Sequence, residues 1–286
     1  MLPQDDAPPA LPLHGLAVVS LAVNVPGPVA ATRLRALGAR VVKVEPPTGD
    51  PLELYSADWY RELAAGQEVA RLDLKDPAGR GALDELLAGG DLLLTSSRLS
   101  ALERLGLGWG ALHARHPRLC QVAIFGHPGA ERDRAGHDLT YQAAQGLAAP
   151  DGLPRTLLAD LASAERAVGA ALGLLLARER GAEAGYAEVT LQEVAADFAA
   201  PLRHGLTAPG GLLGGGLAAY GVYAVREGYV AMAALEPHFA ARLREELGVA
   251  ELTREALEAA LGPALAAITG RDARAWFRLC GYAIAN

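Results

Sequence analysis

The sequence predicts an α/β protein: a large domain built on a parallel, Rossmann-like sheet, followed by a small α+β domain. Short apolar runs, typical of buried parallel strands, alternate with helical segments through residues 1–204. Apolar residues make up 51% of the 286 residues, enough for a large core. A glycine-rich stretch, residues 205–216, predicts the linker to the second domain, residues 217–286.

The predicted strands of the large domain are apolar runs that end at glycine, proline or polar residues. They are residues 16–21, 40–44, 69–74, 91–94, 120–125 and 186–191. The helices expected between them are residues 29–37, 77–87, 99–105, 110–115, a segment that begins near 138, 161–178 and 192–202. Residues 48–68 are expected to be irregular. The first strand–helix–strand unit lacks G-x-G-x-x-G, which argues against a nicotinamide or flavin cofactor.

The second domain is predicted from one hairpin and three helices. The hairpin strands are residues 221–225 and 229–234. The helices are residues 238–247, 253–268 and 271–279. This order of a hairpin and then helices indicates a small α+β unit.

Composition and charge argue against several classes of partner. The net charge of −7 gives no electrostatic reason to expect nucleic acid binding, although a local basic patch would suffice for a small polyanionic ligand. The two cysteines, Cys120 and Cys280, make no disulfide framework and fit a reducing, cytoplasmic location. No signal peptide and no membrane helix is predicted. No pair of His or Cys has metal-ligand spacing, so no metal is expected.

Ionisable side chains lie at two places where a strand or loop meets a helix. His137 precedes the helix that begins near Asp138, and Asp160 precedes the helix 161–178. Ligands collect at the carboxyl ends of strands, beside helix N-termini, so His137 and Asp160 are expected to converge on one site. Structural alternatives exist: Asp160 could cap its helix, and a lone loop histidine is more often structural than catalytic.

Three further positions have more local interpretations. Asp138 is expected to be the N-cap of its own helix. His127 is interpreted as a surface or loop residue. Gly27, at the start of the first helix, fits the close approach of an anionic ligand and an ordinary turn equally well.

Several motifs in register carry a resemblance to a known family. They are A-G-H-D-L-T-Y-Q-A at 135–143, L-L-A-D at 157–160, A-L-E-P-H-F at 234–239, G-A-R-V-V-K-V-E-P-P at 38–47 and L-D-L-K-D-P-A-G-R at 72–80. Together they resemble the class III CoA-transferase (CaiB/BaiF) and α-methylacyl-CoA racemase superfamily, over nearly the whole chain. The resemblance implies a Rossmann-like large domain, a small domain and an interlocked homodimer. It also implies that the chain is short at its C-terminus, because the segment that returns to the large domain is missing.

The resemblance implies roles for the separated ionisable residues. Asp160 matches the aspartate that attacks the donor thioester in transferases and exchanges the α-proton in racemases. His137 matches the racemase base on the other face of the substrate, and Glu236 matches the glutamate that orients that histidine. The glycine-rich loop that covers the aspartate in transferases corresponds to Gly214, Gly215 and Gly216.

Coenzyme A is implied as a moiety of the substrate, with no permanently bound cofactor. The residues expected to contact it are Arg98, Lys43, Arg71, Lys75, Arg104 and Gly27. The basic N-R-G-K-R-S stretch of the family is replaced by A-G-Q-E-V-A at 65–70, which predicts a weaker or different contact with the 3′-phosphate of CoA.

The leading interpretation is CoA transfer between an acyl-CoA and a small carboxylic acid through an aspartyl intermediate. Two alternatives stay open. The first is an α-methylacyl-CoA racemase or epimerase, which the presence of both His137 and Glu236 favours. The second is a non-catalytic, truncated relative, which the short C-terminus and the lost basic stretch favour.

Overall fold

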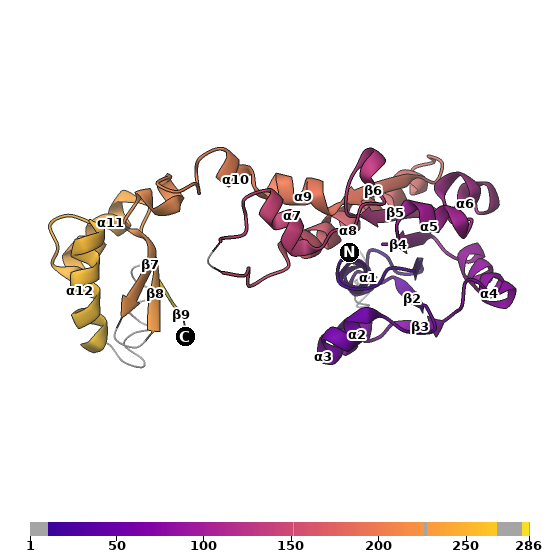
Figure 1. Ribbon diagram of the computed structural model, residues 1–286, viewed down its shortest axis with the longest axis horizontal. Helices are drawn as coiled ribbons and strands as arrows, with labels where there is room; N and C mark the ends of the chain where they lie inside the picture. The colour runs from indigo at the N-terminus through magenta and orange to yellow at the C-terminus, as the bar shows by residue number, and fades with distance from the viewer. Residues whose placement is uncertain (1–10, 151, 226–227, 268–281, 286) are drawn as a thin grey trace, which may run out of the picture. The chain divides into compact units, whose positions relative to one another are not determined.

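The structure is a computed structural model that describes residues 11–150, 152–225, 228–267 and 282–285 (Figure 1). The chain divides into two compact units, Met1–Phe198 and Ala199–Asn286. This division falls before the glycine-rich stretch at 205–216, which therefore belongs to the second unit. Within the described ranges, no helix combines the length and apolarity that crossing a bilayer requires.

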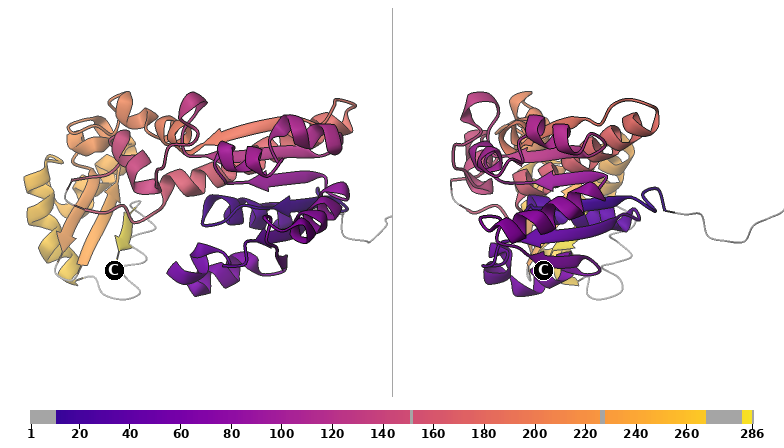
Figure 2. Two further views of the ribbon diagram at one scale, coloured as in Figure 1. Left: turned by 45° about the vertical axis from the view of Figure 1, so that its right-hand side comes forward. Right: turned by 90° about the vertical axis from the view of Figure 1, so that its right-hand side faces the viewer.

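The first unit is built on a six-stranded sheet in which every pair of neighbouring strands is parallel (Figures 1 and 2). The strand order is β3-β2-β1-β4-β5-β6, that of a doubly wound Rossmann-like sheet. The strands are β1 (Ala17–Ser20), β2 (Arg40–Glu45), β3 (Glu68–Arg71), β4 (Leu92–Thr95), β5 (Cys120–Phe125) and β6 (Tyr186–Thr190). The predicted fold class and the six predicted strands are confirmed, with shifts of a few residues at the strand ends.

Helices cover both faces of this sheet. They are α1 (Pro26–Ala36), α2 (Pro51–Tyr55), α3 (Ala57–Ala64), α4 (Pro77–Ala88), α5 (Leu99–Arg104), α6 (Trp109–Arg115), α7 (Asp138–Ala144), α8 (Leu158–Glu179) and α9 (Leu191–Phe198), with a 3₁₀ turn η1 (Gly129–Glu131). Buried apolar side chains of α1, α8 and α9 form one core against the sheet. Those of α4, α5 and α6 form the other core, on the opposite face.

The prediction that residues 48–68 are irregular is wrong, because α2 and α3 lie there. The start signal is Asp50 followed by Pro51: the Asp50 carboxylate accepts a hydrogen bond from the Leu52 N–H, and proline suits the first helical turn. The next helix, α3, is amphipathic and buries Tyr60 and Leu63. Tertiary packing of a few apolar residues thus stabilises two helices too short to recognise by periodicity.

Helices α1 and α8 lie side by side and run in the same direction. Both follow strands of the parallel sheet and pack in one core, so both begin at the carboxyl edge of the sheet. An ion pair at 2.9 Å joins Arg33 of α1 to Glu165 of α8. Each of these residues lies about two turns into its helix, so the first turns of the two helices are nearly level.

The second unit consists of a short antiparallel sheet and helices. Strands β7 (Tyr220–Val225), β8 (Gly228–Ala233) and β9 (Tyr282–Ala285) form the sheet in that order. Its helical segments are α10 (Ala200–Arg203), a π-helical turn η2 (Leu212–Gly216), α11 (Pro237–Leu247) and α12 (Arg254–Ala267). The predicted hairpin and first two helices are confirmed. The predicted helix 271–279 lies outside the described residues, and β9 was not predicted.

Candidate active site

Helix α7 begins at the carboxyl edge of the sheet, directly after His137. The hydroxyl of Thr140 accepts a hydrogen bond from the His137 backbone N–H at 3.1 Å and donates one to the His137 carbonyl oxygen at 2.7 Å. These two bonds fix the backbone at the helix start and leave the imidazole exposed to solvent. His137 is thus presented at the edge where ligands of such sheets bind.

Asp138 and Asp160 bring the starts of α7 and α8 together. Asp138 is 6% exposed, and its Oδ1 accepts a hydrogen bond from the Asp160 backbone N–H at 3.1 Å. Its Oδ2 accepts one from Gln142 Nε2 at 2.5 Å. The Asp160 N–H is one of the first-turn donors of α8 that have no partner within the helix. Asp138 therefore caps α8.

Two sequence-based interpretations are corrected here. Asp138 is not the N-cap of its own helix, because that position belongs to His137. Asp160 is not a cap either, since α8 begins at Leu158 and places Asp160 within the first turn. The Asp160 carboxyl group is therefore not occupied in capping α8.

Burial raises the pKa of Asp160 to about 7, and the nearby charge of Asp138 acts in the same direction. At neutral pH the carboxyl group is therefore divided between its acid and its carboxylate. A group in this state can take up or give up a proton, and its ionised form is a desolvated nucleophile.

Tyr141, in the first turn of α7, was missed in the sequence analysis. It is 3% exposed, and burial together with the charge of Asp160 raises the pKa of its hydroxyl group. The hydroxyl lies between two glycines: a Cβ atom on Gly126 would be 2.1 Å from the Tyr141 oxygen, and one on Gly136 would be 2.2 Å from it. The glycines at both ends of the loop before α7 were the sequence signal for this slot.

A cavity of about 440 Å³ is lined by His137 and by side chains of α7. Its lining also includes Tyr141 and His127, which sequence reasoning had interpreted as a surface or loop residue. His127 does lie in the loop after β5, but it is not a surface residue: it is 8% exposed, and its ring lies edge-on to Tyr141 at 5.2 Å between centroids. Its Nδ1 contacts Oε1 of Gln192 at 2.5 Å. The pocket therefore contains two imidazoles.

A second cavity, of about 490 Å³, lies over the carboxyl ends of β1 to β4. Val23, Glu45, Lys75 and Ser97 are among its lining residues, and most of the lining is apolar. Three expected CoA contacts are here or next to it along the chain: Lys75 itself, Arg98 and Arg104. All three side chains are exposed, and none forms an ion pair with any residue in the described ranges.

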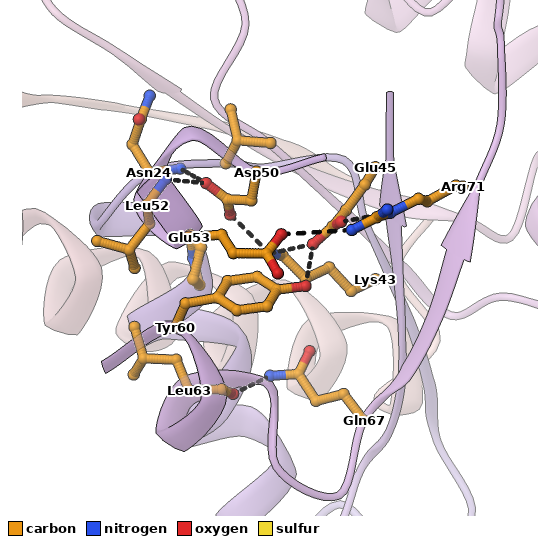
Figure 3. A network of polar contacts seen from close by, with 12 residues as sticks. Asn24, Lys43, Glu45, Asp50, Leu52, Glu53, Tyr60, Leu63, Gln67 and Arg71 are labelled. Carbon is orange, nitrogen blue, oxygen red and sulfur yellow. Dashed lines mark hydrogen bonds and ion pairs between the residues drawn. The ribbon is translucent and has the colours of Figure 1, made fainter. Parts of the chain in front are cut away.

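Lys43 has a different environment from the one expected for a phosphate contact (Figure 3). It is 1% exposed, and its Nζ lies 2.7 Å from Glu45 Oε1 and 2.6 Å from Asp50 Oδ2. The same Nζ lies 4.6 Å from the centre of the Tyr60 ring, whose hydroxyl donates to Glu45 at 2.8 Å. A lysine with two carboxylate partners and no exposed surface cannot bind a ligand phosphate, so Lys43 is withdrawn from the CoA contacts.

Arg71 lies beside the same carboxylates as Lys43: its Nε is 3.6 Å from Glu45 Oε2, and its Nη2 is 3.3 Å from Glu53 (Figure 3). Burial would raise the pKa of Glu45, but hydrogen bonds from Lys43 and Tyr60 hold it below its usual value. Burial, and then the bond to Glu45, raises the pKa of Tyr60 to about 12. The side chains of Lys43, Glu45 and Tyr60 therefore stabilise one another. Arg71, at the edge of this network, already pairs with the carboxylates of Glu45 and Glu53.

Gly27 is explained by packing within the fold. A Cβ atom there would be 2.0 Å from the Cβ of Ala22, so only glycine allows α1 to pack closely against the end of β1. The ordinary-turn interpretation is sufficient, and Gly27 is not retained as a CoA contact.

Glu236 and the three glycines belong to the second unit. Glu236 is the exposed N-cap residue of α11 and makes no side-chain capping bond. Gly215 has a φ of 98°, and a Cβ on Gly214 would be 1.9 Å from the Ala208 oxygen, so the loop itself requires these glycines. Their expected approach to His137 and Asp160 stays a prediction. Among the described residues, no group of three or more His, Cys, Asp or Glu side chains could hold a metal ion.

The parallel sheet is doubly wound, and the Asp160 carboxyl group, with its raised pKa, lies near the edge where the strands end. This arrangement defines an α/β protein with a carboxyl group suited to acid–base or nucleophilic chemistry. The chain belongs to CoA-transferase family III, whose model matches residues 13–279. The resemblance inferred from the motifs is therefore confirmed.

Curated relatives and a solved structure agree with this assignment. The chain is 32% identical to succinyl-CoA–D-citramalate CoA-transferase of Chloroflexus aurantiacus over 63% of its length and 48% of the relative. It is 33% identical to human α-methylacyl-CoA racemase over 83% of its length and 65% of the relative. A crystal structure of a hypothetical protein from Mycobacterium tuberculosis superposes with a TM-score of 0.82 at 25% identity, over 97% of this chain and 86% of that one. The chain thus spans about half to two thirds of these curated relatives.

Proposed function

We propose that the chain transfers CoA between an acyl-CoA and a small carboxylic acid, with Asp160 as the nucleophile. The observation that carries this proposal is the carboxyl group of Asp160, desolvated in the first turn of α8 and with a pKa of about 7. Curated relatives support the reaction type, since they are named as succinyl-CoA–D-citramalate, succinyl-CoA–L-malate and succinate–glutarate CoA-transferases. The resemblance gives the glycines 214–216 the role of covering the aspartate in transfer, whereas it gives His137 and Glu236 roles in the racemase alternative.

The proposed reaction proceeds by four exchanges at acyl carbons. The Asp160 carboxylate attacks the donor thioester, which expels the CoA thiolate and leaves a mixed anhydride. The thiolate attacks the aspartyl carbonyl, which releases the donor acid as a carboxylate and leaves an aspartyl-CoA thioester. The acceptor carboxylate repeats the first step on that thioester. The thiolate then attacks the acceptor's carbonyl, which frees Asp160 as a carboxylate.

We propose a path for CoA from the 490 Å³ cavity to Asp160, across the carboxyl edge of the sheet. The 490 Å³ cavity, with Lys75 and the neighbouring Arg98 and Arg104, adjoins the core of α4 to α6, whereas α8 belongs to the other face. Between β1 and β4 the connecting loops leave toward opposite faces, which is where doubly wound folds bind nucleotides. Two hydrogen bonds between Ser96 Oγ and the Val23 backbone, at 3.1 and 3.4 Å, join these loops. We propose that the pantetheine arm crosses the edge here.

The second candidate is proton exchange at the carbon next to the thioester, as in a racemase. His137 favours it, since an exposed imidazole at the start of α7 could accept the α-proton on one face while Asp160 serves the other. The similarity to human α-methylacyl-CoA racemase supports it as well. Enolate stabilisation would still be needed, because such a proton is only weakly acidic.

Incubation with a panel of 2-methylacyl-CoA thioesters and carboxylic acids in deuterated water, read by mass spectrometry, tests both candidates. We expect CoA to appear on the added acid without deuterium at the α-carbon. His137→Ala is expected to retain this transfer within about threefold, because the imidazole takes no part in the four exchanges. Uptake of one deuterium that disappears in His137→Ala would instead establish the racemase.

The non-catalytic alternative has its own outcome in the same experiment. A protein that is not stabilised by millimolar CoA or acetyl-CoA, and that yields neither product, has lost the function of its relatives. A ligand at 100 times its dissociation constant should add about 2.7 kcal/mol to the free energy of unfolding. Thermal unfolding with and without CoA is sufficient to detect this increment.

A further inference from the structure

We propose that the cavity beside His137 is a carboxylate subsite, in which Arg134 and His127 bind the second carboxylate of a dicarboxylic acid. This inference rests on the proposed function, because the other carboxylate of that acid would exchange with Asp160. It names the class of acid that the site takes, a short-chain dicarboxylate.

The cavity is built from a buried imidazole and an arginine on one loop. His127, at 8% exposure, follows the end of β5, and Arg134 lies on the same connection to α7. The oxygen of the Gln192 amide contacts His127 Nδ1 at 2.5 Å and can only accept, so Nδ1 carries the proton. The other ring nitrogen, Nε2, forms no hydrogen bond with any described residue, and as an imidazolium His127 would donate from it to a carboxylate in the cavity.

Glu131 indicates that this place suits a carboxylate. Its Oε2 lies 3.3 Å from Arg134 Nη1 and 3.9 Å from His127 Nδ1, so a carboxylate oxygen of the chain already lies beside both groups. Glu131 is on the 3₁₀ turn η1 and its side chain is 56% exposed. Arginine has five N–H donors and Glu131 uses few of them, which leaves Arg134 able to bind a second carboxylate.

Tyr141 connects the cavity to the proposed nucleophile. Its side chain lines the cavity, and its hydroxyl group is close enough to Asp160 for that charge to raise its pKa. Helix α7 contributes Tyr141 to the cavity lining. The same helix contributes Asp138, which accepts the hydrogen bond from the Asp160 N–H. In the proposed pose, an acid with one carboxylate in the cavity extends along α7 toward Asp160.

Succinate and butyrate separate this subsite from general binding of acids, because they have the same chain length and differ by one carboxylate. Thermal unfolding is titrated with each acid, and the KM of each as acceptor is measured with acetyl-CoA as donor. The wild-type protein is expected to bind succinate at least about 10-fold more tightly than butyrate. Arg134→Gln is expected to abolish this preference, and His127→Phe to reduce it, both without a change in the KM for acetyl-CoA.

Arg132→Gln is the matched control. Arg132 is on the same loop, but it pairs with Glu188 at 2.9 Å and does not line the cavity, so the preference should persist. Glu131→Gln removes the competing carboxylate and should tighten succinate binding. Equal affinity for the two acids in the wild-type protein, or an unchanged preference in Arg134→Gln, overturns the inference. Preference for succinate without any CoA transfer would leave the subsite standing and count against the proposed function instead.

Discussion

Replacement of Asp160 by asparagine is expected to lower CoA transfer by at least about 10³-fold, because the amide cannot form the anhydride. The substitution keeps the shape of the side chain and leaves its backbone N–H bonded to Asp138. Steady-state transfer from acetyl-CoA measures the loss. Treatment of the wild-type protein with hydroxylamine during turnover, followed by peptide mass spectrometry, should locate the reactive acyl group on Asp160. Transfer at near wild-type rate by Asp160→Asn would exclude the aspartyl route.

The pH dependence of stability shows whether Asp160 has the ionisation described here. Its folded pKa, about 7, lies above the ordinary value of 3.8, so the native protein holds a proton that the unfolded chain has already lost. The free energy of unfolding should therefore fall as pH rises from about 4 through 7. Asp160→Asn lacks this titration and should be more stable than the wild-type protein at pH 8, with little difference at pH 4. Identical pH profiles would contradict the raised pKa.

Replacement of Lys43 by methionine is expected to destabilise the protein by about 3–5 kcal/mol, because it removes the cation that lies between two buried carboxylates. The carboxylates of Glu45 and Asp50 have side chains that are 0% exposed and cannot regain water without local opening. Urea denaturation of both proteins measures the difference. Lys75→Met serves as the control, since Lys75 is exposed and should change stability by less than about 0.5 kcal/mol.

A Lys43→Met protein that fails to fold would still be informative. The triple variant Lys43→Met, Glu45→Gln, Asp50→Asn removes the charges together and should recover part of the stability, since neutral amides tolerate burial better than unpaired carboxylates. A fully stable single variant would mean that Lys43 is not buried between these carboxylates. Weakened CoA binding in a stable variant would restore Lys43 as a phosphate contact.

The sequence alone predicted the α/β class, the six strands of the parallel sheet and the positions of His137 and Asp160. These features depend on local signals: continuous apolar runs for buried strands, and ionisable residues at the junctions of strands or loops with helices. Asp76 followed by Pro77 likewise predicted the start of α4, where Asp76 accepts from the Ala78 N–H. The family resemblance added the functional roles, because the motifs occur in register along one chain.

Only the tertiary structure decided the ionisation and availability of individual side chains. Lys43 and Lys75 are both lysines near the same edge, but one is enclosed by two carboxylates and the other is exposed. Asp138 caps α8 and not its own helix, since a capping bond reaches from α7 to α8 across 22 positions of sequence. His127 and Tyr141 became candidate site residues only because both line a cavity, which is formed by the tertiary structure. Burial and partner distance set a pKa and a binding role, and both depend on residues that are distant in sequence and adjacent only in the fold.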